Sequence, residues 1–148
     1  MPTRSLNSSV LRWPDGASVL RAARTWACQV GRARADVSRI VLFGSLARGD
    51  WAFGSDLDLI VVVSDSPLPF TDRPATFDTV ALPVSTDLLV YTTREWESMA
   101  EGVAGSGMRR LGRIAERVVW LYDASKNAAA ARNVRQGEQQ LAEGHPDL

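Results

Sequence analysis

Residues 44–58 read GSLARGDWAFGSDLD, and this stretch decides the fold. A Gly-Ser pair, Gly44 and Ser45, is followed after ten residues by an Asp-x-Asp pair, Asp56 and Asp58. On a strand, residues two apart point to the same face and lie about 6.6 Å apart along the chain. If Asp56 and Asp58 stand on a strand, both carboxylates are therefore directed to one place.

The segments around this stretch alternate between strand and helix patterns. Short runs rich in β-branched residues, bounded by glycine or polar residues, predict strands, whereas apolar residues at helical spacing predict helices. This order predicts an α/β or α+β protein in which helices cover a sheet. Strands are expected over residues 37–43, 56–63, 84–91 and 118–122. Helices are expected over residues 16–31, 45–48, 75–82 and 108–117, and from the N-cap residue Thr93 onward.

The acidic residues indicate a metal site. Two carboxylates as close as those of Asp56 and Asp58 would repel and raise one another's pKa, so a hard cation such as Mg²⁺ is expected between them. Asp87 interrupts an otherwise apolar strand and is expected on the same face. Three acids around two ions about 3.5 to 4 Å apart describe a site for in-line phosphoryl displacement. Asp56 and Asp58 would hold both ions, and Asp87 would hold one and help to deprotonate the acceptor hydroxyl.

The Gly-Ser pair is expected to bind phosphate. A turn at Gly44 without a Cβ lets backbone amides approach a phosphate, and the helix start that follows offers unpaired N–H groups. The Ser45 hydroxyl can add one hydrogen bond. Arg48 either reaches a triphosphate oxygen or pairs with Asp50, and the sequence leaves both open. Trp51 is expected in the core or an interface, with bordering the nucleotide as the alternative.

Composition narrows the function classes. The 148 residues fit one domain, and 17 basic residues balance 17 acidic ones, so overall charge does not favour nonspecific binding to nucleic acid, and no nucleic-acid partner is expected. The single cysteine, Cys28, cannot form an internal disulfide, and the first residues contain no long apolar run, so a cytoplasmic location is expected. No apolar stretch approaches the roughly 20 residues that a membrane span needs.

These motifs resemble the nucleotidyltransferase fold family of DNA polymerase beta, and within it the minimal nucleotidyltransferases (MNT) paired with HEPN toxins. The resemblance covers roughly residues 16–123 and implies a polymerase-beta-like fold, with a mixed sheet and helices packed mainly on one side. We accordingly expect a flexible segment over residues 1–15, a nucleotidyltransferase domain over 16–123, and a helix with a polar tail over 124–148. The family's Gly-Ser, Asp-x-Asp and later Asp are matched by Gly44, Ser45, Asp56, Asp58 and Asp87.

The same resemblance implies an activity. Such a protein would be an antitoxin that uses Mg²⁺ and ATP to transfer AMP onto a tyrosine of a HEPN ribonuclease toxin, which is thereby inactivated. The N-terminal segment and the glycine-rich break over Gly102 to Gly107 depart from the family pattern and leave the partner open. Two alternatives remain: a nucleotidyltransferase acting on a small molecule such as an aminoglycoside or on an RNA end, and a non-catalytic module that binds and covers a toxin.

Overall fold

The computed structural model describes residues 13–100 and 117–143, and within these ranges the strands form one four-stranded sheet in the order β3-β2-β1-β4. Most of the helix expected over residues 108–117 and all of the Gly102 to Gly107 break lie outside these ranges. The elements are α1 (Gly16–Ala33), β1 (Val37–Phe43), α2 (Gly44–Arg48), β2 (Leu57–Val63), the 3₁₀ helix η2 (Phe70–Thr76), β3 (Thr86–Thr92), α3 (Thr93–Ala100), β4 (Val119–Asp123) and α5 (Ala124–Glu143).

The sheet is mixed, as expected from the resemblance. β1 is antiparallel to both β2 and β4, whereas β2 and β3 are parallel and are joined by a crossover that contains η2. Each strand lies within two residues of its predicted bounds, because the β-branched runs and their polar boundaries determine where pairing begins and ends. The sheet brings the first residues of β2 and β3 to the same end.

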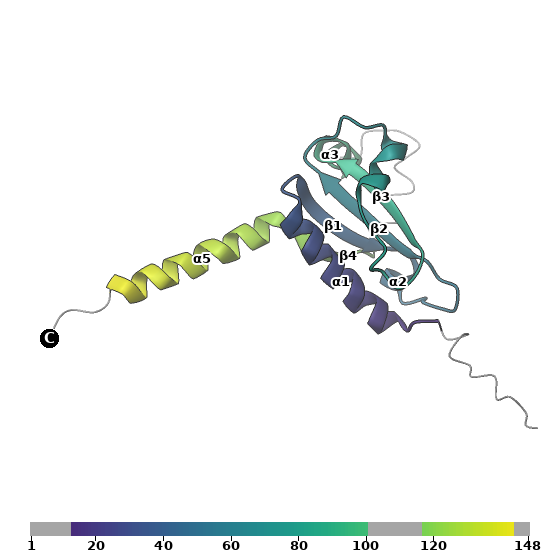
Figure 1. Ribbon diagram of the computed structural model, residues 1–148, viewed down its shortest axis with the longest axis horizontal. Coiled ribbons are helices and arrows are strands. Elements are labelled where there is room, and N and C mark those ends of the chain that lie inside the picture. The colour runs from purple at the N-terminus through teal and green to yellow at the C-terminus, as the bar shows by residue number, and fades with distance from the viewer. Residues whose placement is uncertain (1–12, 101–116, 144–148) are drawn as a thin grey trace, which may run out of the picture.

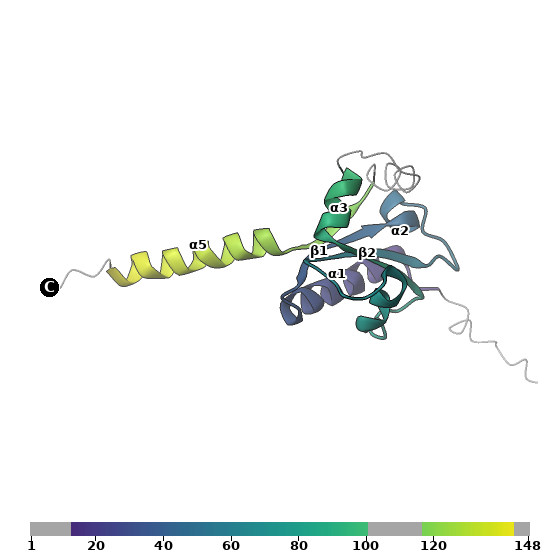
Figure 2. The same ribbon diagram turned by 90° about the horizontal axis from the view of Figure 1, so that it is seen from above.

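Helix α1 covers one face of the sheet (Figures 1 and 2). It begins where the Asp15 carboxylate accepts a 2.7 Å hydrogen bond from the Ser18 amide, which caps the helix start. Its apolar stripe, which includes Ala23 and Trp26, packs against buried side chains of every strand. The buried residues on this side include Ile40, Leu42, Leu57, Leu59, Val61, Val90 and Leu121.

The opposite face is covered by α3. Val41, Ile60 and Val62 are buried there, and Trp96 of α3 packs against them. The N-cap residue of this helix is Thr92, so the prediction of Thr93 as the N-cap was wrong. The Thr92 hydroxyl accepts from the Glu95 amide at 3.3 Å, and the Glu95 carboxylate accepts from the Thr92 amide at 3.0 Å, which is a capping box.

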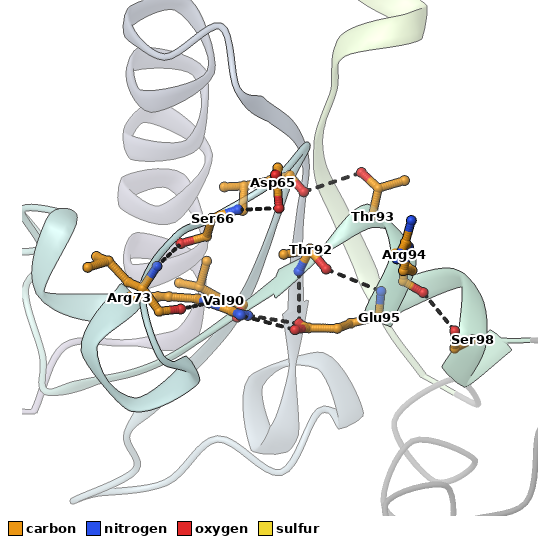
Figure 3. A network of polar contacts seen from close by, with 11 residues as sticks. Asp65, Ser66, Arg73, Val90, Thr92, Thr93, Arg94, Glu95 and Ser98 are labelled. Carbon is orange, nitrogen blue, oxygen red and sulfur yellow. Dashed lines mark hydrogen bonds and ion pairs between the residues drawn. The ribbon is translucent and has the colours of Figure 1, made fainter.

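The prediction of a helix over residues 75–82 was wrong. The helical turn in this region is η2, which ends at Thr76, and bends and turns follow it. The reason is Arg73, whose side chain is only 8% exposed. Its guanidinium donates to the Leu68 carbonyl at 3.0 Å, to the Val90 carbonyl at 3.2 Å, and to both Glu95 oxygens at 2.8 and 3.0 Å (Figure 3). This network fixes η2 against β3 and α3, and no local sequence pattern encodes it.

Helix α5 follows β4 directly and extends away from the sheet (Figures 1 and 2). The Asp123 carboxylate accepts from the Ser125 amide at 3.0 Å and from its hydroxyl at 2.6 Å, which caps the helix start. Within the described ranges, α5 and the other helices all lack the combination of length and apolar character needed to cross a membrane.

Candidate metal and nucleotide site

The candidate acids lie where β2 and β3 begin. Asp58 is the second residue of β2, and its neighbours across the sheet are Phe43 on β1 and Asp87 on β3. Asp58 and Asp87 are therefore adjacent on parallel strands, with the same register and the same face. Asp56 directly precedes β2, which begins at Leu57, one residue later than predicted. The strand register thus places Asp58 beside Asp87, whereas Asp56 lies just before the paired residues.

Burial distinguishes the three carboxylates. Leu57 and Leu59 are fully buried on the α1 side, whereas Asp58 between them is half-buried on the opposite face, and Asp56 and Asp87 are exposed. Burial, followed by the negative charges of Asp87 and Asp56, raises the pKa of Asp58 above its usual value. An ionised Asp58 is therefore in an unfavourable environment that a bound cation would relieve.

The donor set fits a hard cation, although the three carboxylates are not preassembled. Among residues 13–100 and 117–143, no three His, Cys, Asp or Glu side chains converge closely enough to hold a metal ion. Carboxylate oxygens are the ligands that Mg²⁺ prefers, and strand pairing already fixes the backbones of Asp58 and Asp87 side by side. The exposed side chains of Asp56 and Asp87 would have to turn toward Asp58 to complete the site.

Gly44 lies against Asp58. Its φ of +77° is in the left-handed region, and a Cβ built there would overlap the Asp58 carboxylate and lie 2.8 Å from its Cγ. The backbone at the end of β1 can approach the carboxylate this closely only because residue 44 has no side chain. The turn predicted to bind phosphate and Asp58, one of the acids predicted to bind metal, are therefore in direct contact.

Ser45 and Arg48 occupy the two ends of α2. Ser45 lies in the first turn, half-buried, and Phe43 at the N-cap contributes no capping hydrogen bond from its side chain. The sequence left two possibilities open for Arg48, and in the structure it pairs with Asp50, with 3.2 Å between Arg48 Nε and Asp50 Oδ2. Both side chains are more than half exposed, so this pair contributes about 0 to 1 kcal/mol. The positive charge of Arg48 also acts on Asp58, where it partly offsets the rise in the pKa of that carboxyl.

The loop between α2 and β2 contains a contact that the sequence analysis missed. Trp51 is half-buried and packs against the core on the α1 side, and its indole N–H donates to the Pro14 carbonyl at 2.9 Å. Trp51 therefore packs against the core, which agrees with the first of the two expectations. A proline carbonyl leaves no mark in a sequence pattern, so its pairing with an indole N–H could not be foreseen.

Comparison with known proteins finds a family similarity over the part of the chain that carries these acids. Residues 29–97 match the nucleotidyltransferase domain family, and this range contains the Gly-Ser pair and all three acids. This range is similar to nucleotidyltransferase domains, and the fold is the polymerase-beta-like nucleotidyltransferase fold. No curated protein matches the sequence closely enough to serve as a relative.

Solved structures support the fold. A candidate nucleotidyltransferase from Sulfolobus solfataricus superposes with a TM-score of 0.54 at 20% identity, covering 75% of this chain and 86% of its own. Two more distant matches are a toxin–antitoxin with AMP-PNP (TM-score 0.41, 16% identity, 88% and 92% covered) and a tri-AMPylated HEPN toxin of Shewanella oneidensis in complex with an MNT antitoxin (TM-score 0.32, 15% identity, 86% and 87% covered). With TM-scores below 0.5, these last two matches do not support any statement about the fold of this chain.

Proposed function

We propose that this protein is a magnesium-dependent nucleotidyltransferase that transfers AMP from ATP to a hydroxyl group. The observation that carries the proposal is the pairing of Asp58 with Asp87 on adjacent parallel strands, with the Gly44 backbone packed against the Asp58 carboxylate. The match of residues 29–97 to the nucleotidyltransferase domain supports the same class of reaction.

Each residue has a role in this proposal. Asp56 and Asp58 would hold two Mg²⁺ ions, and Asp87 would hold one of them. When bound, the ions neutralise charge on the triphosphate and on the acceptor oxygen. The backbone amides of Gly44 and Ser45 orient the triphosphate, to which Arg48 can turn by leaving its weak pair with Asp50.

The reaction follows from this placement. The acceptor oxygen bonds to the α-phosphorus as the bond between that phosphorus and the β-phosphate oxygen breaks, so pyrophosphate leaves with the electron pair. Asp87 accepts or positions the proton of the acceptor hydroxyl. Loss of Asp87 should accordingly lower the rate of transfer more than the affinity for nucleotide.

The acceptor in this proposal is a tyrosine of a HEPN ribonuclease toxin, so the protein would act as an antitoxin that adenylylates and inactivates its partner. The support is the resemblance of the Gly-Ser, Asp-x-Asp and later Asp pattern to the minimal nucleotidyltransferases. This identification of the acceptor is separable from the chemistry, since the same five residues would serve any hydroxyl.

The test is transfer of label from nucleotide to protein. The purified protein is incubated with Mg²⁺ and α-labelled ATP, GTP, CTP or UTP, with and without the product of the neighbouring gene. Asp56→Ala should abolish transfer, whereas Asp50→Ala, which removes an exposed acid of the same loop, should retain it. Labelling of the partner from ATP alone supports both parts of the proposal. A stable complex without transfer would contradict the enzymatic part and favour a module that only binds.

A further inference from the structure

The loop between α2 and β2, residues 49–56, sets the spacing between the Gly-Ser turn and the Asp-x-Asp pair. It contains two glycines with left-handed backbone, Gly49 and Gly54, and a tight turn in which Ser55 bonds to Ala52 through its amide and its hydroxyl. These bonds are local. They shape the loop but do not attach it to the rest of the domain.

Trp51 provides an attachment over a long sequence distance. Its indole N–H donates to the Pro14 carbonyl at 2.9 Å, just before α1. The ring also lies against Gly16, where an added Cβ would be 3.5 Å from Trp51 Cβ and Cδ1 and 3.1 Å from Leu46 Cδ1. One indole therefore contacts the start of α1 and lies beside α2, while its own backbone belongs to the loop.

A second aromatic contact extends this attachment. The Trp13 ring lies 5.5 Å from the Phe53 ring, centroid to centroid, in a tilted arrangement. Phe53 is 72% exposed, so its contact with Trp13 is weaker than that of a buried pair. Trp51, which combines a hydrogen bond with core packing, is therefore the main attachment of the loop to the residues before α1.

We propose that Trp51 is a positioning residue for nucleotidyl transfer: it fixes the loop so that Asp56 and the Gly44-Ser45 turn face the same nucleotide. The inference rests on the proposed function, because it assigns Trp51 to that site. Trp51 acts through the backbone of the loop and does not touch the nucleotide. Misplacement of a reacting group by about 1 Å can lower a rate on the order of 100-fold, so a small movement of the loop would be measurable.

Trp26 offers a matched control. Its indole N–H donates to the Asp78 carbonyl at 2.7 Å, again over a long sequence distance, and its ring packs in the same core. Trp51→Phe and Trp26→Phe each remove one indole-to-carbonyl hydrogen bond and keep an aromatic ring. Only the first removes a bond that holds the loop. Trp26 is the more deeply buried of the two, at 4% exposed, so a purely structural role predicts at least as large an effect from Trp26→Phe as from Trp51→Phe.

The experiment measures amide hydrogen exchange over residues 49–58 and, in parallel, the kcat and KM for Mg·ATP in the label-transfer assay. Trp51→Phe should speed exchange in this segment and lower kcat about tenfold or more below that of Trp26→Phe, with less change in KM. Equal exchange over residues 49–58, or equal kcat in the two variants, would overturn the inference while leaving the proposed function intact. A wild-type protein that neither binds Mg·ATP nor transfers label would contradict the proposed function, and the inference with it.

Discussion

Gly44→Ala tests the contact between the Gly44-Ser45 turn and Asp58. An alanine at φ +77° has a left-handed backbone, which costs about 1 to 2 kcal/mol. In addition, the new Cβ would overlap the Asp58 carboxylate and lie 2.8 Å from its Cγ and 3.1 Å from its Cβ. Either the start of α2 or the Asp58 side chain must move, and both are parts of the candidate site.

Two glycines of the following loop serve as controls that separate the cost of a left-handed backbone from the cost of overlap with Asp58. Gly49 has φ +83° and Gly54 has φ +81°, yet a Cβ at either position would meet no atom of the described residues within 4 Å. Gly49→Ala and Gly54→Ala therefore measure backbone strain alone. Gly49→Ala and Gly54→Ala should each lose about 1 to 2 kcal/mol of stability, and Gly44→Ala should lose more.

The assay combines thermal unfolding with calorimetric titration of Mg·ATP. Gly44→Ala should weaken nucleotide binding or transfer on the order of 100-fold, whereas the two controls should stay within a few-fold of wild type. In an Asp58→Ala background, the extra stability cost of Gly44→Ala should disappear, because the overlapping carboxylate is gone, with a coupling of about 1 kcal/mol or more. A Gly44→Ala protein that binds Mg·ATP as well as Gly49→Ala does would refute the contact as a functional one.

Three further predictions concern stability. Glu95→Gln should destabilise the protein at pH 7 by about 1 to 2 kcal/mol, because it removes the counter-charge of the buried Arg73 while Glu95 itself is partly exposed. Hydrogen bonding to Arg73 holds the pKa of Glu95 below its usual value, so this stabilisation is complete above that usual pKa and is lost as the pH falls through the lowered one. Urea unfolding of wild type and variant should therefore converge at low pH. Asp58→Asn should stabilise the protein without Mg²⁺ at pH 7, because the raised pKa of Asp58 means that its charge disfavours folding. Differential scanning calorimetry should also show that Mg·ATP no longer raises the Tm of this variant. Gly31→Ala should cost about 1 to 3 kcal/mol in chemical unfolding, because its Cβ would overlap the Tyr122 ring, and an unchanged midpoint would show that the ring moves freely.

The strands and the places of the three acidic residues at the strand starts could be predicted because their signals are local. The β-branched runs ending at Gly44 and beginning after Asp56 define β1 and β2 within one residue. Asp87 could be recognised because it interrupts an apolar run, and the parallel register then places it beside Asp58. Because successive side chains of a strand point to opposite faces of the sheet, the face on which each residue lies follows once the bounds of the strand are known.

The features that could not be predicted depend on contacts between distant segments. The position of η2 depends on Arg73 reaching Val90 and Glu95 across the sheet edge. The attachment of Trp51 depends on a backbone carbonyl at Pro14. Backbone acceptors have no residue type, so bonds to them leave no pattern in the sequence.

The choice of N-cap for α3 failed for a different reason. Thr92 and Thr93 are both good caps, and a sequence cannot rank two adjacent residues of the same type by local propensity alone. The Glu three residues after Thr92 was the available signal, since it completes a capping box. Thr93 instead donates its hydroxyl to the Val63 carbonyl at 3.3 Å.

The most direct test of AMP transfer from ATP is to follow two phosphorus labels through the reaction. Parallel reactions with α-labelled and γ-labelled ATP, Mg²⁺ and the acceptor should place the α label on the acceptor and leave the γ label in released pyrophosphate. Both products should disappear in Asp58→Ala and persist in Asp50→Ala. Transfer of the γ label to the acceptor, or α-label transfer that survives Asp58→Ala, would contradict a nucleotidyltransferase centred on these aspartates.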